Sequence, residues 1–88
     1  MYRAGSTFKF DYEHDGVLEK NHWFILTKTY ESSYIFQLIC IKGYHAGTIE
    51  CYIKKESHDF EISKEHLIME LNRNFLKIHW DTFEDIEL

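Results

Sequence analysis

Hydrophobic and polar residues alternate along much of this chain with the period of two that is typical of β-strands. In the segment 7–12, the aromatic residues Phe8, Phe10 and Tyr12 occupy every second position, which places them on one face of a strand. Asp15-Gly16 follows as a turn sequence. The pattern predicts a first strand that ends at a tight turn.

Two longer runs follow, His22–Tyr30 and Tyr34–Ile41, which are apolar at nearly every position. Their β-branched and aromatic content favours strands. Apolar residues on both faces are typical of central strands covered on both sides or of a small closed barrel. These runs therefore predict two adjacent central strands, in either a barrel or a sandwich.

Gly43 and Gly47 bracket a predicted turn, and the segment 48–54 then alternates cleanly, with Ile49, Cys51 and Ile53 on one face. A hairpin symmetric about residues 45 and 46 would place Cys40 directly opposite Cys51, because paired positions in a hairpin have a constant index sum. A bulge would remove this pairing.

Towards the C-terminus the period changes from two to that of a helix. Ser63 is a suitable N-cap, and Leu67, Leu71 and Phe75 follow at a spacing of four, as in a short amphipathic helix. Alternation then resumes at Leu76, Ile78 and Trp80 as a last strand, after which residues 82–85 are predicted to cap a short terminal turn.

Together these segments predict a mainly β (α+β) fold. We expect a small antiparallel, SH3-like, partly open barrel or curved sheet of about five strands, with one short helix near the C-terminus. The chain has 88 residues, 44% of them hydrophobic, and no proline. Residues 1–88 are therefore predicted to form one domain.

Composition also bears on the compartment. No run approaches the roughly 18 apolar residues that span a bilayer, and the first ten residues have no apolar signal core. Cys40 and Cys51 are too few for a disulfide scaffold. We expect a soluble cytoplasmic protein without a membrane partner.

The formal net charge is -5. This sign is wrong for coating a nucleic-acid backbone and favours a basic protein partner. The same charge also keeps a small, apolar-rich domain soluble, which is the alternative reading.

Six histidines invite a metal or acid–base interpretation. A zinc site from Cys40, Cys51, His45 and His58 is conceivable, but none of the histidines has a recognised ligand spacing, so surface histidines, no metal and no cofactor are predicted. The motifs of common hydrolases, nucleotide enzymes and metalloproteases are absent from the sequence.

Metal-independent RNA cleavage needs a base, an acid and a cation for the phosphorane. The candidates are His22, His45, Lys28 and Lys42, although their spacing does not select them. Histidines and lysines at strand ends are more often solvated than catalytic.

The order of segments resembles the small barrels of MazF/PemK-type toxins and their phage and plasmid relatives. The likeness lies in Gly5-Ser6-Thr7-Phe8, in the run 22–27, in Tyr34–Ile41 and in the stretch 51–63. The Arg-Pro of that family is replaced here by His22-Trp23, so no catalytic residue is carried over. The resemblance implies a small barrel and, as one option, a divergent endoribonuclease.

The preferred functional prediction is a small acidic, non-enzymatic binding protein of a bacterial or phage conflict system, most simply an immunity or antitoxin-type inhibitor of a basic toxin. The predicted contact residues are four aromatics ringed by acids: Tyr2, Tyr44, Tyr52, Phe83, Glu50, Glu84 and Asp85. A solvated acidic tail would look the same at the C-terminus. The alternatives are a divergent MazF/PemK-like metal-independent endoribonuclease and a purely structural oligomer.

Overall fold

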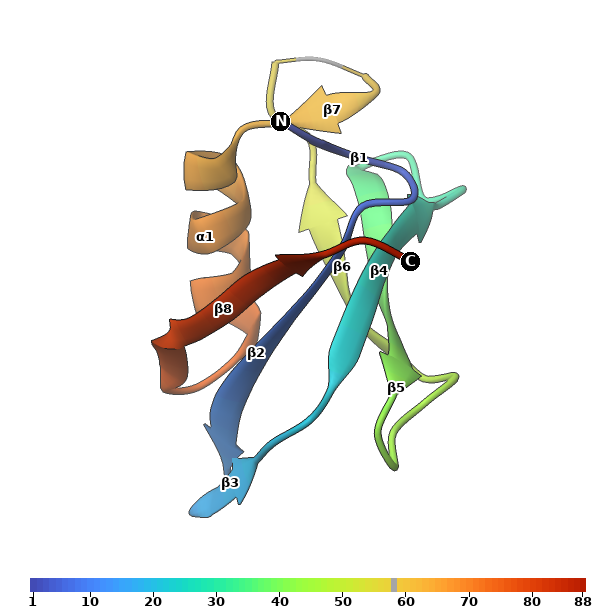
Figure 1. Cartoon of the computed structure of the whole chain (residues 1–88). Coiled ribbons are helices and arrows are strands. Elements are labelled where there is room, and N and C mark those ends of the chain that lie inside the picture. Colours follow the sequence, from blue (N-terminus) through green and yellow to red (C-terminus); the bar gives the residue numbers. More distant parts are fainter. Residues whose placement is uncertain (58) are drawn as a thin grey trace.

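The computed structural model describes residues 1–57 and 59–88. The elements follow in the order β1 (Tyr2–Arg3), β2 (Thr7–His14), β3 (Val17–Glu19), β4 (Trp23–Lys28), β5 (Tyr34–Lys42), β6 (Ile49–Lys54), β7 (Glu61–Ile62), α1 (Lys64–Asn74) and β8 (Ile78–Ile86). The main sheet has six strands, of which β3 is a short strand paired with the end of β2. Figure 1 shows that this antiparallel sheet curls into a half-barrel, with the helix α1 beside it. This confirms the predicted fold class.

None of the helices among the described residues has the length and apolar character that crossing a membrane requires.

Strand β2 lies at the centre of the sheet and is paired along both edges. Phe8 is opposite Phe24 of β4 on one edge and opposite Asp85 of β8 on the other. The edge of β2 that pairs with β4 near Phe8 pairs with β3 further along the strand. There His14 is opposite Val17, and the Asp15-Gly16 turn connects the two strands. The predicted first strand and its turn are confirmed.

The core consists mainly of aromatic rings from the inner face of the sheet. Phe8, Phe10 and Phe24 are fully buried, and the rings of Phe10 and Phe24 stack with centroids 4.6 Å apart. Helix α1 lies along the open side of the curled sheet (Figure 1) and contributes Leu67 and Leu71, also fully buried. Each such side chain stabilises the fold by about 1.5–3 kcal/mol.

The helix begins as predicted. The Ser63 hydroxyl accepts a hydrogen bond from the backbone N–H of His66, which makes Ser63 the N-cap. Glu70 is buried on this helix, where its carboxylate accepts from the Lys54 N–H at 2.7 Å and pairs with Arg73 at 3.1 Å. A buried carboxylate needs such partners, so Glu70 ties α1 to β6.

Of the two alternatives for the central strands the half-barrel is the one observed, and the prediction for residues 82–85 is wrong. The outer-face residues Trp23, Ile25 and Ile39 are half-buried, so β4 and β5 are covered on one face only. Residues 82–85 do not cap a terminal turn, because they belong to β8, where Glu84 pairs with Lys9. The last strand is accordingly longer than its apolar alternation indicates.

The predicted opposition of the two cysteines is also wrong. The hairpin turns earlier in the chain than predicted, because the backbone of Cys40 already bonds to Gly47 and Thr48, and Cys51 pairs with Leu38. The β5–β6 ladder also has a register shift between Leu38 and Ile39. The same shift turns Ile49 outwards, where its side chain is exposed. Both cysteines are buried free thiols.

Candidate functional site

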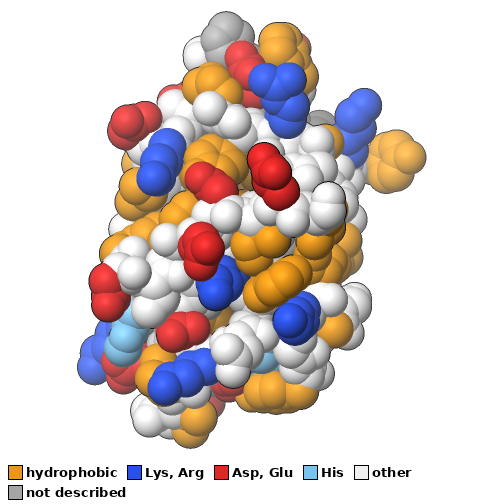
Figure 2. Space-filling model, viewed as in Figure 1, with side chains coloured by type: hydrophobic (Ala, Val, Ile, Leu, Met, Phe, Trp, Pro, Cys, Tyr) orange, Lys and Arg blue, Asp and Glu red, His pale blue; other side chains and the backbone are white. Residues whose placement is uncertain are grey.

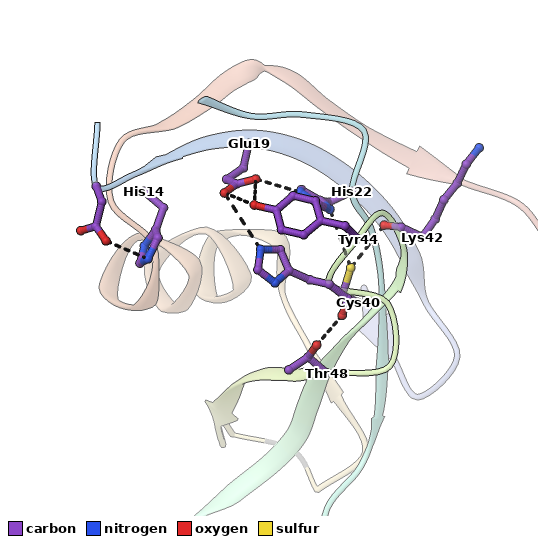
Figure 3. A network of polar contacts seen from close by, with 9 residues as sticks. His14, Glu19, His22, Cys40, Lys42, Tyr44 and Thr48 are labelled. Carbon is purple, nitrogen blue, oxygen red and sulfur yellow. Dashed lines mark hydrogen bonds and ion pairs between the residues drawn. The ribbon is translucent and has the colours of Figure 1, made fainter. Parts of the chain in front are cut away.

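Four polar side chains meet where the β3–β4 connection lies against the β5–β6 turn (Figure 3). The carboxylate of Glu19 accepts hydrogen bonds from the Tyr44 hydroxyl at 2.6 and 2.8 Å and lies 3.2 Å from Nε2 of His22. Nε2 of His45 lies 4.0 Å from the other oxygen of Glu19. We call these four residues the Glu19 cluster.

The local backbone explains how the Glu19 cluster forms. Asn21 adopts a positive φ of 61°, a conformation that asparagine tolerates, immediately before the inward-facing His22. Gly43 has a φ of 114° and passes so close to the imidazole that a Cβ there would lie 2.0 Å from Nδ1 of His22. Only glycine meets both conditions, so the turn and the His22 ring pack as one unit.

Hydrogen bonding within the Glu19 cluster shifts the pKa values of Glu19 and Tyr44 in opposite directions. The hydrogen bond from Tyr44 and then that from His22 lower the pKa of Glu19 below its ordinary value. The same hydrogen bond raises the pKa of Tyr44, because an ionised phenol would face a carboxylate. Glu19 is therefore an anion at neutral pH, and Tyr44 is its neutral donor.

Cys40 lies beside the Glu19 cluster, with its sulfur 4.0 Å from Nδ1 of His22, whereas Cys51, on β6, lies opposite Leu38. The Cys40 thiol donates to the Lys42 carbonyl at 3.2 Å, and burial raises its pKa. Burial also raises the pKa of Cys51 to about 12. A thiol held protonated is inert. His58, the remaining member of the conceivable zinc set with His45, lies outside the described residues.

A hollow of about 360 Å³ adjoins the cluster, and His45, Glu50 and Tyr12 line it together with the end of α1. One oxygen of Glu50 is buried and has no hydrogen-bond partner among the described residues. Burial, and next the charge of Glu50, raise the pKa of Tyr12. The hollow thus has a phenol, a carboxylate and an imidazole in its wall.

The structure brings together only part of the predicted ribonuclease set. The rings of His22 and His45 lie 5.3 Å apart, but His22 is only 1% exposed, so the prediction of surface histidines is wrong for this residue. Lys42 lies over the Trp23 ring, 4.1 Å from its centroid. Lys28 lies at the opposite end of β4 and is not part of this group.

The predicted partner-binding residues fall into two groups. Tyr44, Glu50 and Tyr52 belong to the β5–β6 hairpin, where Tyr44 is 76% exposed and Tyr52 36%. The Tyr52 ring packs against Tyr34, with centroids 5.4 Å apart. This group has an exposed aromatic character, as predicted.

The second group surrounds β8 and differs from the prediction. Tyr2 is 7% exposed, and its hydroxyl donates to Asp85 at 2.7 Å. Phe83 is half-buried and stacks on Phe8 at 5.3 Å. Both rings pack in or against the core, because these side chains point inwards from their strands. Of the four predicted residues in this second group, only Glu84 and Asp85 are exposed.

Glu19 is the central residue that sequence reasoning missed. The sequence feature that could have indicated it is a glutamate at the end of a short strand, three residues before His22. On β3, Glu19 is opposite Tyr12, an inward-facing position, and a buried acid at such a position requires partners. Those partners come from a turn 25 residues away, which no local pattern reveals.

Comparison with known proteins found no relative of this chain. No family model, no curated protein and no solved structure matches the chain.

Proposed function

We propose that this chain is a non-enzymatic binding protein that uses β8 to recognise an extended basic segment of a partner protein, in the manner of an immunity or antitoxin-type inhibitor of a basic toxin. One observation carries the proposal. Within the described residues, β8 pairs with β2 only, so no strand covers its other edge. Such an edge can accept a strand from another chain.

The charge along β8 favours a cationic segment. Asp81, Glu84, Asp85 and Glu87 are all exposed, and Figure 2 shows acidic side chains gathered over this strand. Glu84 is paired with Lys9 at 3.3 Å, whereas Asp81 and Glu87 have no cationic partner among the described residues. A lysine- or arginine-rich segment would complete these pairs.

Apolar side chains lie over β4 (Figure 2), which is separated from β8 by β2. The outer face of β4 presents the half-buried Trp23 and Ile25, so they offer apolar contact to parts of the partner that extend across the sheet, not to the segment added at the edge of β8. An apolar patch with a charged rim is the usual layout of a protein interface. The small size, the net charge of -5 and the lack of enzyme motifs in the sequence support an inhibitor.

The test is capture of partners from native lysate at low and moderate salt. The wild-type chain is compared with Asp81→Lys/Glu87→Lys and with the control Glu31→Lys/Asp59→Lys, which changes the net charge equally at a hollow that no residue of β8 lines. We expect the wild type and the control to recover one basic protein, and the β8 variant to lose at least about tenfold in affinity for it. Equal affinity for all three chains would refute the role of β8.

A divergent metal-independent endoribonuclease is the second candidate, and the proximity of His22 to His45 favours it. The burial of His22 and the distant Lys28 count against it. Purified protein is incubated with RNA in a chelating buffer. Cleavage that disappears in both His22→Ala and His45→Ala would establish this activity, and absence of cleavage would exclude it.

A further inference from the structure

We propose that Glu19, His22 and His45 form a binding site for a divalent transition metal, with Zn²⁺ the best-suited ion. The histidine spacings in the sequence predict no metal, so this site differs from that expectation. The inference does not depend on the proposed function, because the site lies at the β3–β4 connection and the β5–β6 turn rather than on β8.

The distances between the ligand atoms are those of a nearly formed site. One ligand atom from each residue lies within 4.8 Å of the others. Nε2 of His22 is 3.2 Å from Glu19, and Nε2 of His45 is 4.0 Å from it. Ligands at about 2.0–2.1 Å from a tetrahedral zinc are about 3.3 Å apart, so a shift of at most about 1.5 Å in His45 closes the site.

Two of the three ligands are already held in place. Tyr44 donates its hydroxyl hydrogen bond to Glu19 and orients the carboxylate. Gly43 packs against the His22 ring, and the Cys40 sulfur lies 4.0 Å from Nδ1 of that ring, which leaves Nε2 directed at Glu19. Outer partners of this kind orient metal ligands in proteins.

His45 supplies both adjustment and access. Its side chain is 37% exposed, and it lies in a turn flanked by Gly43 and Gly47, both at positive φ. His45 also lines the hollow beside Glu50 and Tyr12. A metal held by three protein ligands would keep an open coordination position for water.

The ligand types select the class of metal. Two imidazoles and one carboxylate suit zinc and its neighbours in the first transition series, whereas calcium and magnesium prefer oxygen ligands alone. Another histidine–carboxylate pair, His79 with Glu13 at 3.0 Å, has no third ligand in the described part of the chain. It provides a matched control for adventitious binding by a histidine.

The experiment measures Zn²⁺ affinity by competition with a chromogenic chelator, and Co²⁺ coordination by its visible absorption. We expect one equivalent of metal to bind the wild type and His79→Ala with equal affinity. His45→Ala should bind at least about tenfold more weakly. Affinity should also fall on acidification, because protons compete with the metal for its ligands.

Glu19→Gln is the second ligand variant, and the circular dichroism spectrum of each variant establishes that it is folded. Zn²⁺ should raise the Tm of the wild type and of His79→Ala, but not that of either ligand variant. Equal affinity of the wild type and His45→Ala, or no stoichiometric binding by the wild type, would overturn the proposal.

Discussion

Gly43 is the position where a single added methyl group has the most specific expected effect. In Gly43→Ala the new Cβ would meet three atoms of the His22 ring, at 2.0, 2.7 and 3.1 Å. That ring is fully enclosed and contacts Glu19. The methyl group can be accommodated only if the β5–β6 turn moves away from the β3–β4 connection.

The magnitude follows from two separate terms. An L-residue at the positive φ of Gly43 costs about 1–2 kcal/mol, and displacing a packed ring costs about 1–3 kcal/mol more. Gly47 is the matched control, because its φ of 93° carries the same backbone cost while an added Cβ there meets nothing within 4 Å. We expect Gly43→Ala to lose about 2–5 kcal/mol of unfolding free energy and Gly47→Ala about 1–2 kcal/mol.

Urea denaturation measures both variants, followed by fluorescence of Trp23 and Trp80 and by circular dichroism. The effect of alanine on the unfolded chain is the same in both variants and cancels in the comparison. A difference of less than about 0.5 kcal/mol between them would show that Gly43 does not press on His22, and the geometry of the Glu19 cluster would have to be revised.

Three further outcomes can be measured. Ser63→Ala should lose about 1 kcal/mol of unfolding free energy in the same urea assay, because the helix N-cap hydrogen bond is removed; an unchanged midpoint would contradict this. Cys40 and Cys51 should resist a thiol reagent at about pH 8 in the folded protein and react fully in urea, because burial raises both pKa values. Fast labelling of the native protein would show that the thiols are accessible. Because the folded-state pKa of Glu19 lies below its ordinary value of 4.5, the carboxylate stabilises the fold above that pH, and this contribution is lost as the pH falls through 4.5 and below. Glu19→Gln should therefore be less stable than wild type at pH 7, with a shallower loss of stability on acidification, and parallel pH curves would refute this.

Local patterns were enough to predict the elements whose formation depends on neighbours in sequence. Phe8, Phe10 and Tyr12 alternate because one face of β2 is buried, and the Ser63 cap with its apolar stripe defines α1. These signals arise from burial and hydrogen bonding within a few residues, so they are visible without a structure.

Long-range pairing explains what the sequence did not reveal. In the sequence, the acidic residues of β8 resemble a solvated tail, because the exposed face of an edge strand need not carry apolar side chains. The shift at Leu38 is a backbone adjustment that leaves no mark in composition. The Glu19 cluster joins segments 25 residues apart, so only the geometry of two turns brings Tyr44 to Glu19.

The pairing of β8 with β2 also limits the folding rate of the chain. Thr7 and Ile86, which are joined by a hydrogen bond from the threonine hydroxyl, are 79 residues apart. Until β8 pairs with β2, one edge of β2 has no partner strand. The loss of chain entropy on closing this long loop must be overcome before the hydrogen bonds between β2 and β8 contribute any stability. Domains dominated by such distant pairings fold in milliseconds to seconds rather than microseconds. Refolding of this protein should therefore be limited by the arrival of β8, and during that interval the aromatic face of β2 is open to association with other chains.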